Sequence, residues 1–290
     1  MQHPLSTLKH KGYAPRFLRT MKKETLLRLQ PNEGMEETEA RHRLECCLAD
    51  VRLWMAANFL KLNDDKTDFL VVGSKSNLAK SDVCGIKIGQ TQVEPSNNVK
   101  NIGAVLDSHL TMEKQVIVTC KSAWYHLFQL SKIKKHMSQE QLKSAVLAYV
   151  ISKLDQNNSL LVGLPDILIN KLQRVQNAAA RMITGSNRYE EAKHLLFQLH
   201  WLPISFRIDF KILLLTFKSI HGEGPEYLRE LLLEYAPGKN LCSSSRDHLV
   251  QLHTQSKQGD TAFSAAAPRL WNSLPEVLSL PLVLTVLNIP

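Results

Sequence analysis

Three consecutive amphipathic segments within residues 111–186 constrain the fold of this chain more than any other feature. Apolar residues in the first segment alternate in spacings of four and three, which is typical of one buried helix face. The second segment begins with Ser138 three residues before Gln141, a pattern that predicts a capping box. The third is bounded by Pro165 and Gly185. Because short connections join antiparallel neighbours, the segments predict an antiparallel helical bundle.

The helical period also predicts which side chains face the core of this bundle. In the first segment they are Val116, Cys120, Ala123, Leu127 and Leu130. In the second they are Leu142, Val146, Tyr149 and Leu154, and in the third Leu168, Leu172, Val175, Ala179 and Met182. We expect the second helix to continue to Gly163, because glycine readily closes a helix end.

The segment before the bundle has a different pattern. Residues 37–59 fit a helix, and residues 69–72 form a β-prone run after a turn at residues 63–65. Gly89-Gln90 separates two alternating runs and predicts a hairpin, and residues 99–106 form a third run. We expect one small antiparallel sheet, so the predicted fold class is α+β and mostly α.

After the bundle we expect helices at residues 205–221, 225–235 and 262–274, with a Ser-rich linker over residues 236–258. The predicted domain organisation is a disordered basic and acidic arm at 1–36, the sheet segment at 37–110, the bundle at 111–186, C-terminal helices at 187–236, and a linker with a short terminal helix at 237–290.

Composition limits the class of protein and the class of partner. The chain has 290 residues, of which 44% are hydrophobic, and this apolar content excludes a wholly disordered chain. Lys and Arg (36) exceed Asp and Glu (27) by nine, which favours polyanionic partners such as nucleic acid or an anionic membrane surface. The five cysteines form no C-x-x-C pair, so we expect reduced thiols.

Signals for export or membrane insertion are not evident in the sequence. No apolar run approaches the roughly 18 residues that span a bilayer, and no apolar block follows the basic N-terminal residues. We expect an intracellular protein of the nucleus or cytoplasm that is not secreted and has neither a membrane partner nor a small-molecule substrate.

Basic residues cluster on the first and third helices of the predicted bundle. Spaced cations bind phosphate backbones, with a salt-dependent affinity that arises from counterion release. A solvated helix face is the simpler explanation for any single residue, and for the set the two interpretations are evenly matched. The candidate nucleic-acid-binding residues are Lys114, Lys121, Lys132, Lys134, Lys135, Lys171, Arg174 and Arg181.

Motifs for metal or nucleophilic chemistry are weak. Asp64-Asp65 resembles a carboxylate pair that could bind a divalent cation, but adjacent acids in a turn are usually solvated and no third ligand is near in sequence. Residues 73–76 match only the end of a phosphate-binding loop. We therefore expect no metal site and no cofactor.

Six ordered segments resemble reverse transcriptases of LINE-type (non-LTR) retrotransposons. Residues 54–67 (WMAANFLKLNDDKT) are similar to the segment after their catalytic site, and residues 101–107 (NIGAVLD) to their primer-grip strand. The other four segments are residues 152–161, 172–181, 199–204 and 265–275, the last two similar to the far C-terminal region of vertebrate elements. The resemblance covers roughly residues 40–280.

The resemblance implies a palm edge with primer-grip hairpins over residues 40–107 and a thumb over residues 112–186 that holds nucleic acid by its backbone. Lys66 matches a lysine that can protonate the leaving pyrophosphate, and is here a vestigial general-acid position. The Mg²⁺-binding aspartate pair of the family has no counterpart, since residues 1–40 contain no Asp. Without such carboxylates, two-metal phosphoryl transfer loses its nucleophile activation.

We therefore expect a truncated, non-catalytic remnant of an RNA-directed DNA polymerase. Its partner would be RNA or an RNA–DNA duplex, bound weakly and without sequence specificity. Two alternatives stay open: a reverse transcriptase that is active when completed by upstream sequence, and a host-recruited module that binds protein through its helical bundle.

Overall fold

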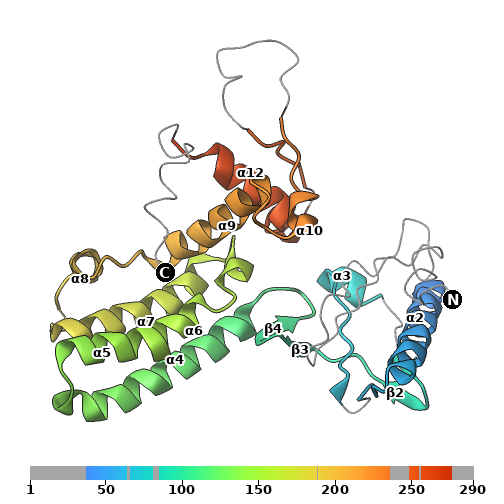
Figure 1. The fold of residues 1–290 in the computed structure, drawn as a ribbon, viewed down its shortest axis with the longest axis horizontal. Coiled ribbons are helices and arrows are strands. Elements are labelled where there is room, and N and C mark those ends of the chain that lie inside the picture. The colour runs from blue at the N-terminus through green and yellow to red at the C-terminus, as the bar shows by residue number, and fades with distance from the viewer. Residues whose placement is uncertain are drawn as a thin grey trace. The chain divides into compact units, whose positions relative to one another are not determined.

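The computed structural model describes residues 37–63, 66–80, 85–187, 189–235, 248–254 and 256–275. The chain divides into two compact units, Met1–Lys114 and Gln115–Pro290. Its described part is mostly helical with short antiparallel strand pairs, which confirms the predicted fold class (Figure 1). The expected arm at residues 1–36 and the Asp64-Asp65 pair lie outside the described residues.

In the first unit, a small core forms between a helix and a hairpin. Helix α2 (Glu37–Ala57) contacts strand β1 (Ile86–Ile88), which pairs with β2 (Thr91–Val93). Leu48 of the helix and the two isoleucines of β1 form one buried hydrophobic cluster. The connecting turn is Gly89-Gln90, as predicted, and Gly89 has a φ of 64°, a conformation that glycine adopts without a steric cost.

A second hairpin replaces the run expected over residues 99–106. Strands β3 (Asn98–Asn101) and β4 (Ala104–Asp107) pair with each other across the two-residue turn Ile102-Gly103. Both turn residues have positive φ, 46° and 81°, as the tight turns of two-residue hairpins require. The described strands therefore form two separate ladders rather than the single sheet that we expected.

The segment that resembled the end of a phosphate loop is a helix cap. Ser74 precedes the short helix α3 (Lys75–Leu78), and its Oγ accepts a hydrogen bond from the Asn77 backbone N–H at 3.2 Å. The β-prone run before it contributes one bridge, between Phe69 and Pro95. The Ser74 cap and the Phe69–Pro95 bridge therefore both have a role in the fold.

The second unit contains the predicted helical bundle. Helices α4 (Glu113–Ile133), α5 (Gln139–Val146) and α7 (Asp166–Thr184) lie side by side in Figure 1. The capping box is present: Ser138 Oγ accepts the Gln141 backbone N–H at 3.2 Å, and the Gln141 side chain accepts the Ser138 backbone N–H at 2.9 Å. This sequence signal therefore places the start of α5 correctly.

A π-helical turn, η3 (Leu147–Ile151), follows α5 and changes which side chains face the core. Its wider hydrogen bonding adds a residue to the turn, so the regular helical period fails here. Val150 is buried, whereas the predicted core residue Tyr149 is exposed. The continuous helical segment formed by α5, η3 and α6 (Ser152–Asp155) ends at Asp155, well before the expected end at Gly163.

Two other predicted core positions are displaced by one residue. On α4, Thr119 is buried and Cys120 is half-buried; on α7, Ile183 is buried and Met182 is half-buried. Such displacements occur where two neighbouring residues flank the centre of a buried face. The predicted end of α7 at Gly185, with a φ of 69°, is confirmed.

Of the C-terminal helices, the first two contact α7 of the bundle, and two of the later ones contact the second. The C-terminal helices are α8 (Ala192–Gln198), α9 (Ile204–Ile220), α10 (Glu226–Arg229), α11 (Lys257–Asp260) and α12 (Phe263–Asn272). The predictions for α9 and α12 are confirmed, and α8 was not predicted. The helix expected over residues 225–235 is only the single turn α10, because Glu234 pairs with Leu249 in a β-bridge instead. Much of the expected linker, residues 236–247, lies outside the described residues.

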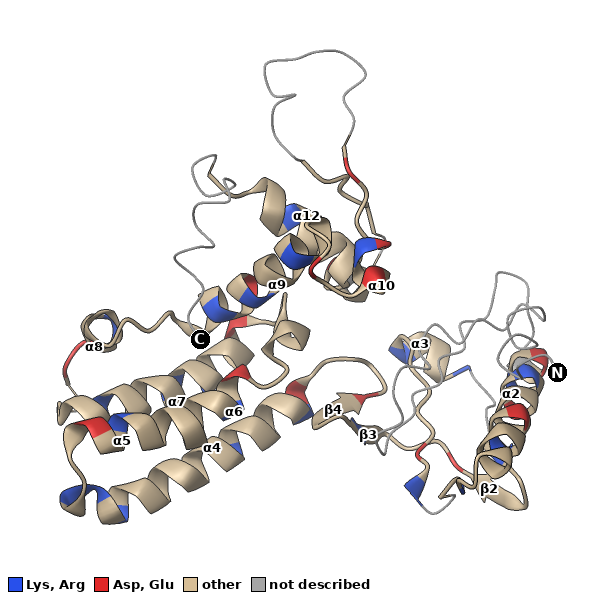
Figure 2. Ribbon diagram, viewed as in Figure 1, with Lys and Arg blue, Asp and Glu red and all other residues tan. Residues whose placement is uncertain are grey.

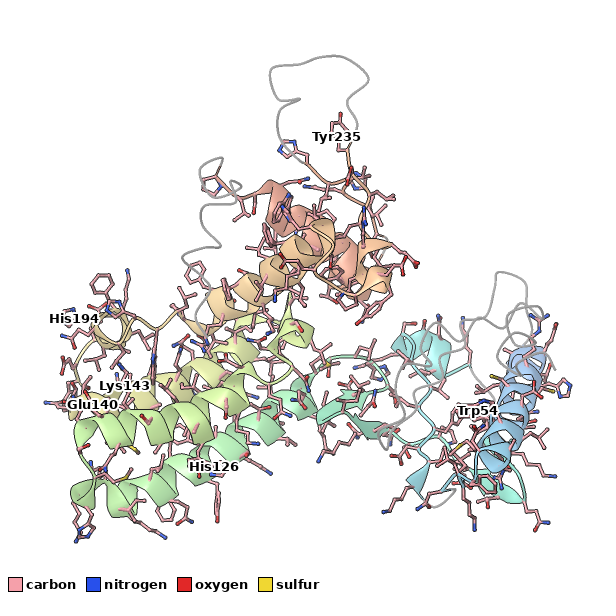
Figure 3. All side chains as sticks on the ribbon, viewed as in Figure 1. Trp54, His126, Glu140, Lys143, His194 and Tyr235 are labelled. Carbon is pink, nitrogen blue, oxygen red and sulfur yellow. The ribbon has the colours of Figure 1, made fainter. Side chains whose placement is uncertain are left out.

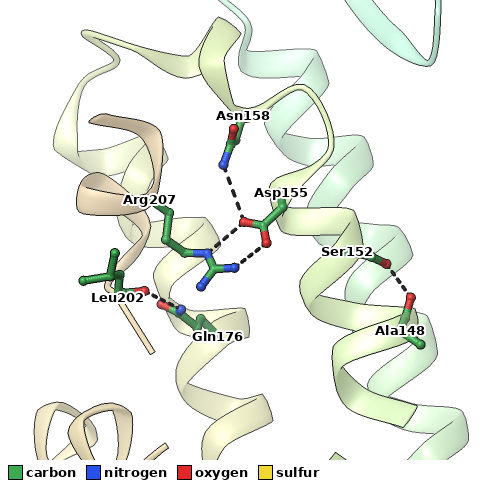
Figure 4. Close-up of polar contacts among 7 residues, drawn as sticks. All are labelled: Ala148, Ser152, Asp155, Asn158, Gln176, Leu202 and Arg207. Carbon is green, nitrogen blue, oxygen red and sulfur yellow. Dashed lines mark hydrogen bonds and ion pairs between the residues drawn. The ribbon is translucent and has the colours of Figure 1, made fainter. Parts of the chain in front are cut away.

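Side-chain hydrogen bonds attach α9 to the bundle (Figure 4). Arg207 of α9 pairs with Asp155 at the end of α6, with an Nε–Oδ1 distance of 2.8 Å and a second contact between Nη2 and Oδ2. Gln176 of α7 is fully buried, and its Nε2 donates to the Leu202 carbonyl oxygen at 2.8 Å. These contacts satisfy polar groups that would otherwise be costly to bury.

Candidate nucleic-acid interface

An open groove between α4 and α7 brings aromatic and basic side chains together. Its volume is about 790 Å³. Its lining residues, which define the groove below, are Ile117, Cys120, Lys121, Trp124, Tyr125 and Phe128 from α4, and Lys171 and Arg174 from α7. Three of the predicted nucleic-acid-binding residues thus line one surface.

Helix α4 presents the aromatic residues because of its period. Trp124, Tyr125 and Phe128 lie three to seven residues after Lys121, so they share one side of the helix. Residues on the opposite side, such as Ala123 and Leu127, are buried in the bundle. The three aromatic residues are 46%, 60% and 58% exposed, respectively. These exposed aromatic side chains lie beside the cations of the groove, which makes the groove a candidate contact site.

The end of α4 extends the positive charge beyond the groove. Lys132 places its Nζ 4.3 Å from the centroid of the Phe128 ring, in a cation–π contact. Lys134 and Lys135 follow in the 3-10 turn η2 (Lys134–His136) and are exposed. Figure 2 shows this concentration of basic residues at the end of α4. The helix dipole independently favours cations at this position, so Lys134 and Lys135 have a structural explanation as well.

The remaining two predicted cations on these helices do not line the groove. Lys114 is exposed in the first turn of α4, two turns before Lys121. Arg181 is half-buried on α7, and its Nη2 donates to the Glu190 carbonyl oxygen at 3.1 Å. Arg181 therefore holds the segment that leads to α8.

Lys66, the vestigial general-acid position, belongs to the first unit. It is exposed on a turn in which its backbone N–H donates to the Asn63 carbonyl oxygen at 3.2 Å. The backbone of Lys66 thus forms part of a turn, and its side chain is exposed to solvent.

The groove contains one thiol, that of Cys120. Burial raises the pKa of this thiol above its usual value, and the charge of Lys171 opposes the shift without cancelling it. Because the nucleophilic form of cysteine is the thiolate, Cys120 is an unreactive neutral thiol near pH 7.

Sequence reasoning missed the aromatic residues of the groove. It considered the buried stripe of α4 and the cations, but not the large aromatic side chains on the opposite side of the stripe. The aromatic surface continues around α4, where His126 contacts Tyr125 edge-on at 5.5 Å and stacks on Tyr149 at 5.7 Å; Figure 3 labels His126. Aromatic residues at helical spacing opposite a buried stripe were the available signal.

The described residues offer neither a metal-binding cluster nor a membrane-spanning helix. No group of three or more His, Cys, Asp or Glu side chains in that part of the chain could hold a metal ion. None of its helices is long and apolar enough to cross a bilayer.

Comparison with known proteins finds no match: no family model fits the chain, and neither a curated protein nor a solved structure is significantly similar to it.

Proposed function

We propose that this chain binds nucleic acid through the groove, without sequence specificity. The observation that supports this function is the convergence of Lys121, Lys171 and Arg174 with three exposed aromatic side chains on one surface. Cations neutralise phosphates, and aromatic rings offer stacking surfaces for bases. In this proposal the chain is a non-catalytic relative of the late palm and thumb of LINE-type reverse transcriptases.

The composition of the groove supports binding that is independent of sequence. Bases are distinguished mainly by hydrogen bonds between their edges and Arg, Lys, Asn, Gln, Asp or Glu side chains. The groove-lining residues include no Asn, Gln, Asp or Glu, and their cations Lys121, Lys171 and Arg174 are also the groups available to the phosphates. Contacts to phosphates position a nucleic acid but carry no sequence information.

The expected salt dependence follows from the number of cations. Lys121, Lys171 and Arg174 line the groove, and Lys132 adjoins it through Phe128. Four phosphate contacts to a single strand give a slope of log K against log salt of about −3. Affinity should therefore fall roughly 50-fold between about 50 and 200 mM salt.

Filter binding of the full chain to a labelled RNA across a salt series tests the proposal. We expect measurable binding at low salt and a slope near −3. A protein-interaction module that buries the same aromatic residues against an apolar partner would bind RNA without a steep salt slope, or not at all. Either outcome would reject nucleic-acid binding as the function of the groove.

A further inference from the structure

From the aromatic residues of the groove we infer that its ligand is single-stranded rather than duplex nucleic acid. This inference rests on the proposed function and concerns the form of the ligand. Trp124, Tyr125 and Phe128 are all about half exposed or more, and Lys132 lies over one face of the Phe128 ring. They form an aromatic platform, defined by these three residues, within a cationic groove.

The faces of aromatic rings can be used only by unpaired bases. In a duplex, each base is stacked between its neighbours and presents only its edges in the grooves. In a single strand, bases can splay out and stack on Trp, Tyr or Phe side chains. The aromatic platform can therefore stack on the bases of a single strand but not on the bases of a duplex.

The positions of the cations fit the same ligand. Lys121 lies about one helical turn before the platform, and Lys132 lies about one turn after it, over the Phe128 ring. Lys171 and Arg174 supply positive charge from the facing helix α7. A strand whose bases stack on the platform thus meets cations for its phosphates at both ends and along one side.

Charge alone predicts the opposite preference, which makes the inference testable. A duplex has a higher charge density than a single strand, and each neutralised phosphate contributes more to its salt dependence, about 0.9 against about 0.7. A purely cationic surface would consequently bind a duplex at least as tightly. A preference for the single strand requires a contribution from the aromatic rings.

Fluorescence anisotropy with the full chain measures this preference. The probes are an unstructured RNA of roughly 20 nucleotides and the same RNA annealed to its DNA complement, at equal salt. We expect the single strand to bind at least about fivefold more tightly. Phe128→Leu keeps the apolar bulk but removes the ring, and should weaken single-strand binding by about 5- to 150-fold with the duplex affinity unchanged.

Matched variants separate stacking from unfolding. Phe197→Leu alters a more exposed aromatic residue on α8, outside the groove, and should change neither affinity. Trp124→Phe keeps a ring and should retain binding, while the quenching of tryptophan emission on adding the single strand is lost. Circular dichroism confirms that each variant is folded.

The outcomes distinguish failure of the single-strand inference from failure of the proposed nucleic-acid-binding function. Equal or tighter binding of the duplex, or an equal effect of Phe128→Leu on both probes, overturns the single-strand inference and leaves the proposed function intact. Absence of salt-dependent binding to either probe rejects the proposed function together with the inference.

Discussion

Asp155 and Arg207 form a two-point ion pair that joins the end of α6 to α9 across 52 positions of sequence. Their side chains are 36% and 20% exposed, so the pair is only partly solvated. Removing one partner leaves a half-buried charge without its counterion. We expect Arg207→Leu to lower the free energy of unfolding by about 1–3 kcal/mol, measured by urea denaturation.

A double-mutant cycle with Asp155→Asn shows whether this loss belongs to the pair. The two effects should be less than additive, because either change alone breaks the same interaction. Strict additivity would mean that the pair contributes nothing to stability.

Gln176 supplies a second connection between the bundle and the C-terminal helices. Its Nε2 donates to the Leu202 carbonyl oxygen, and its Oε1 accepts from Gln173 at 2.8 Å. Gln176→Leu leaves both partners without this hydrogen bond in a buried site, and should cost about 1–3 kcal/mol in chemical denaturation. The control Gln198→Leu, at an exposed position on α8, should change stability by less than about 0.5 kcal/mol. Equal effects of the two variants on the free energy of unfolding would contradict a stabilising role for the buried hydrogen bonds of Gln176.

Several of these structural contacts lie in the segments on which the proposed relationship to LINE-type reverse transcriptases rests. Asp155 and Gln176 belong to two of them, and Asp107 belongs to a third. The Asp107 carboxylate accepts hydrogen bonds from the backbone N–H groups of His109, Thr111 and Met112, at 2.9 to 3.1 Å, and so orders the turn that leads into α4. Segment 172–181 also contains Arg174 of the groove, so these segments contribute both to the framework and to the candidate interface.

The sequence predicted regular features well, because each depends on local rules. Ser138 and Gln141 gave the start of α5, and Gly185 gave the end of α7. The π turn at η3 could not be predicted, since it breaks the helical period on which the prediction of Tyr149 as a core residue depended.

The candidate site was only partly predictable for a related reason. Lys121, Lys171 and Arg174 were identified from charge, but their convergence depends on how α4 packs beside α7. Arg181 has the same charge and is used instead for a contact within the fold. Sequence spacing on one helix cannot distinguish these two uses.

Asp209 on α9 should make stability depend on pH. Burial raises the pKa of its carboxyl above the ordinary value of 3.8, and the charge of Arg269 opposes this shift. Between the unfolded and folded pKa values, the folded chain binds more protons than the unfolded chain, so stability falls as the pH rises through this window. Asp209→Asn removes the cost of the buried charge and should raise Tm at neutral pH, with the gain disappearing below pH 3.8.

Thermal melting from about pH 3 to pH 7 checks the prediction for Asp209. Arg269→Gln serves as the matched control and should lower Tm at neutral pH, because it removes the favourable charge. A lower Tm for Asp209→Asn at neutral pH would show that the carboxylate is stabilising there.

Primer extension tests the expectation that binding occurs without catalysis. The full chain with Mg²⁺, a homopolymer template and a matched primer should incorporate no nucleotide, because two-metal phosphoryl transfer needs carboxylates to hold the ions. Incorporation that Lys66→Ala abolishes would contradict this expectation and restore a catalytic role for Lys66.

The most direct test of the central claim compares RNA binding by two double variants across a salt series. Lys121→Gln with Arg174→Gln removes two cations of the groove, whereas Lys143→Gln with Lys193→Gln removes two exposed cations on α5 and α8, outside it (Lys143 is labelled in Figure 3). We predict weaker binding and a salt slope shallower by about 1.4 for the groove variant, with affinity and slope nearly unchanged for the control. Equal losses in both variants, or no loss in the groove variant, would contradict the assignment of the groove as the nucleic-acid-binding surface.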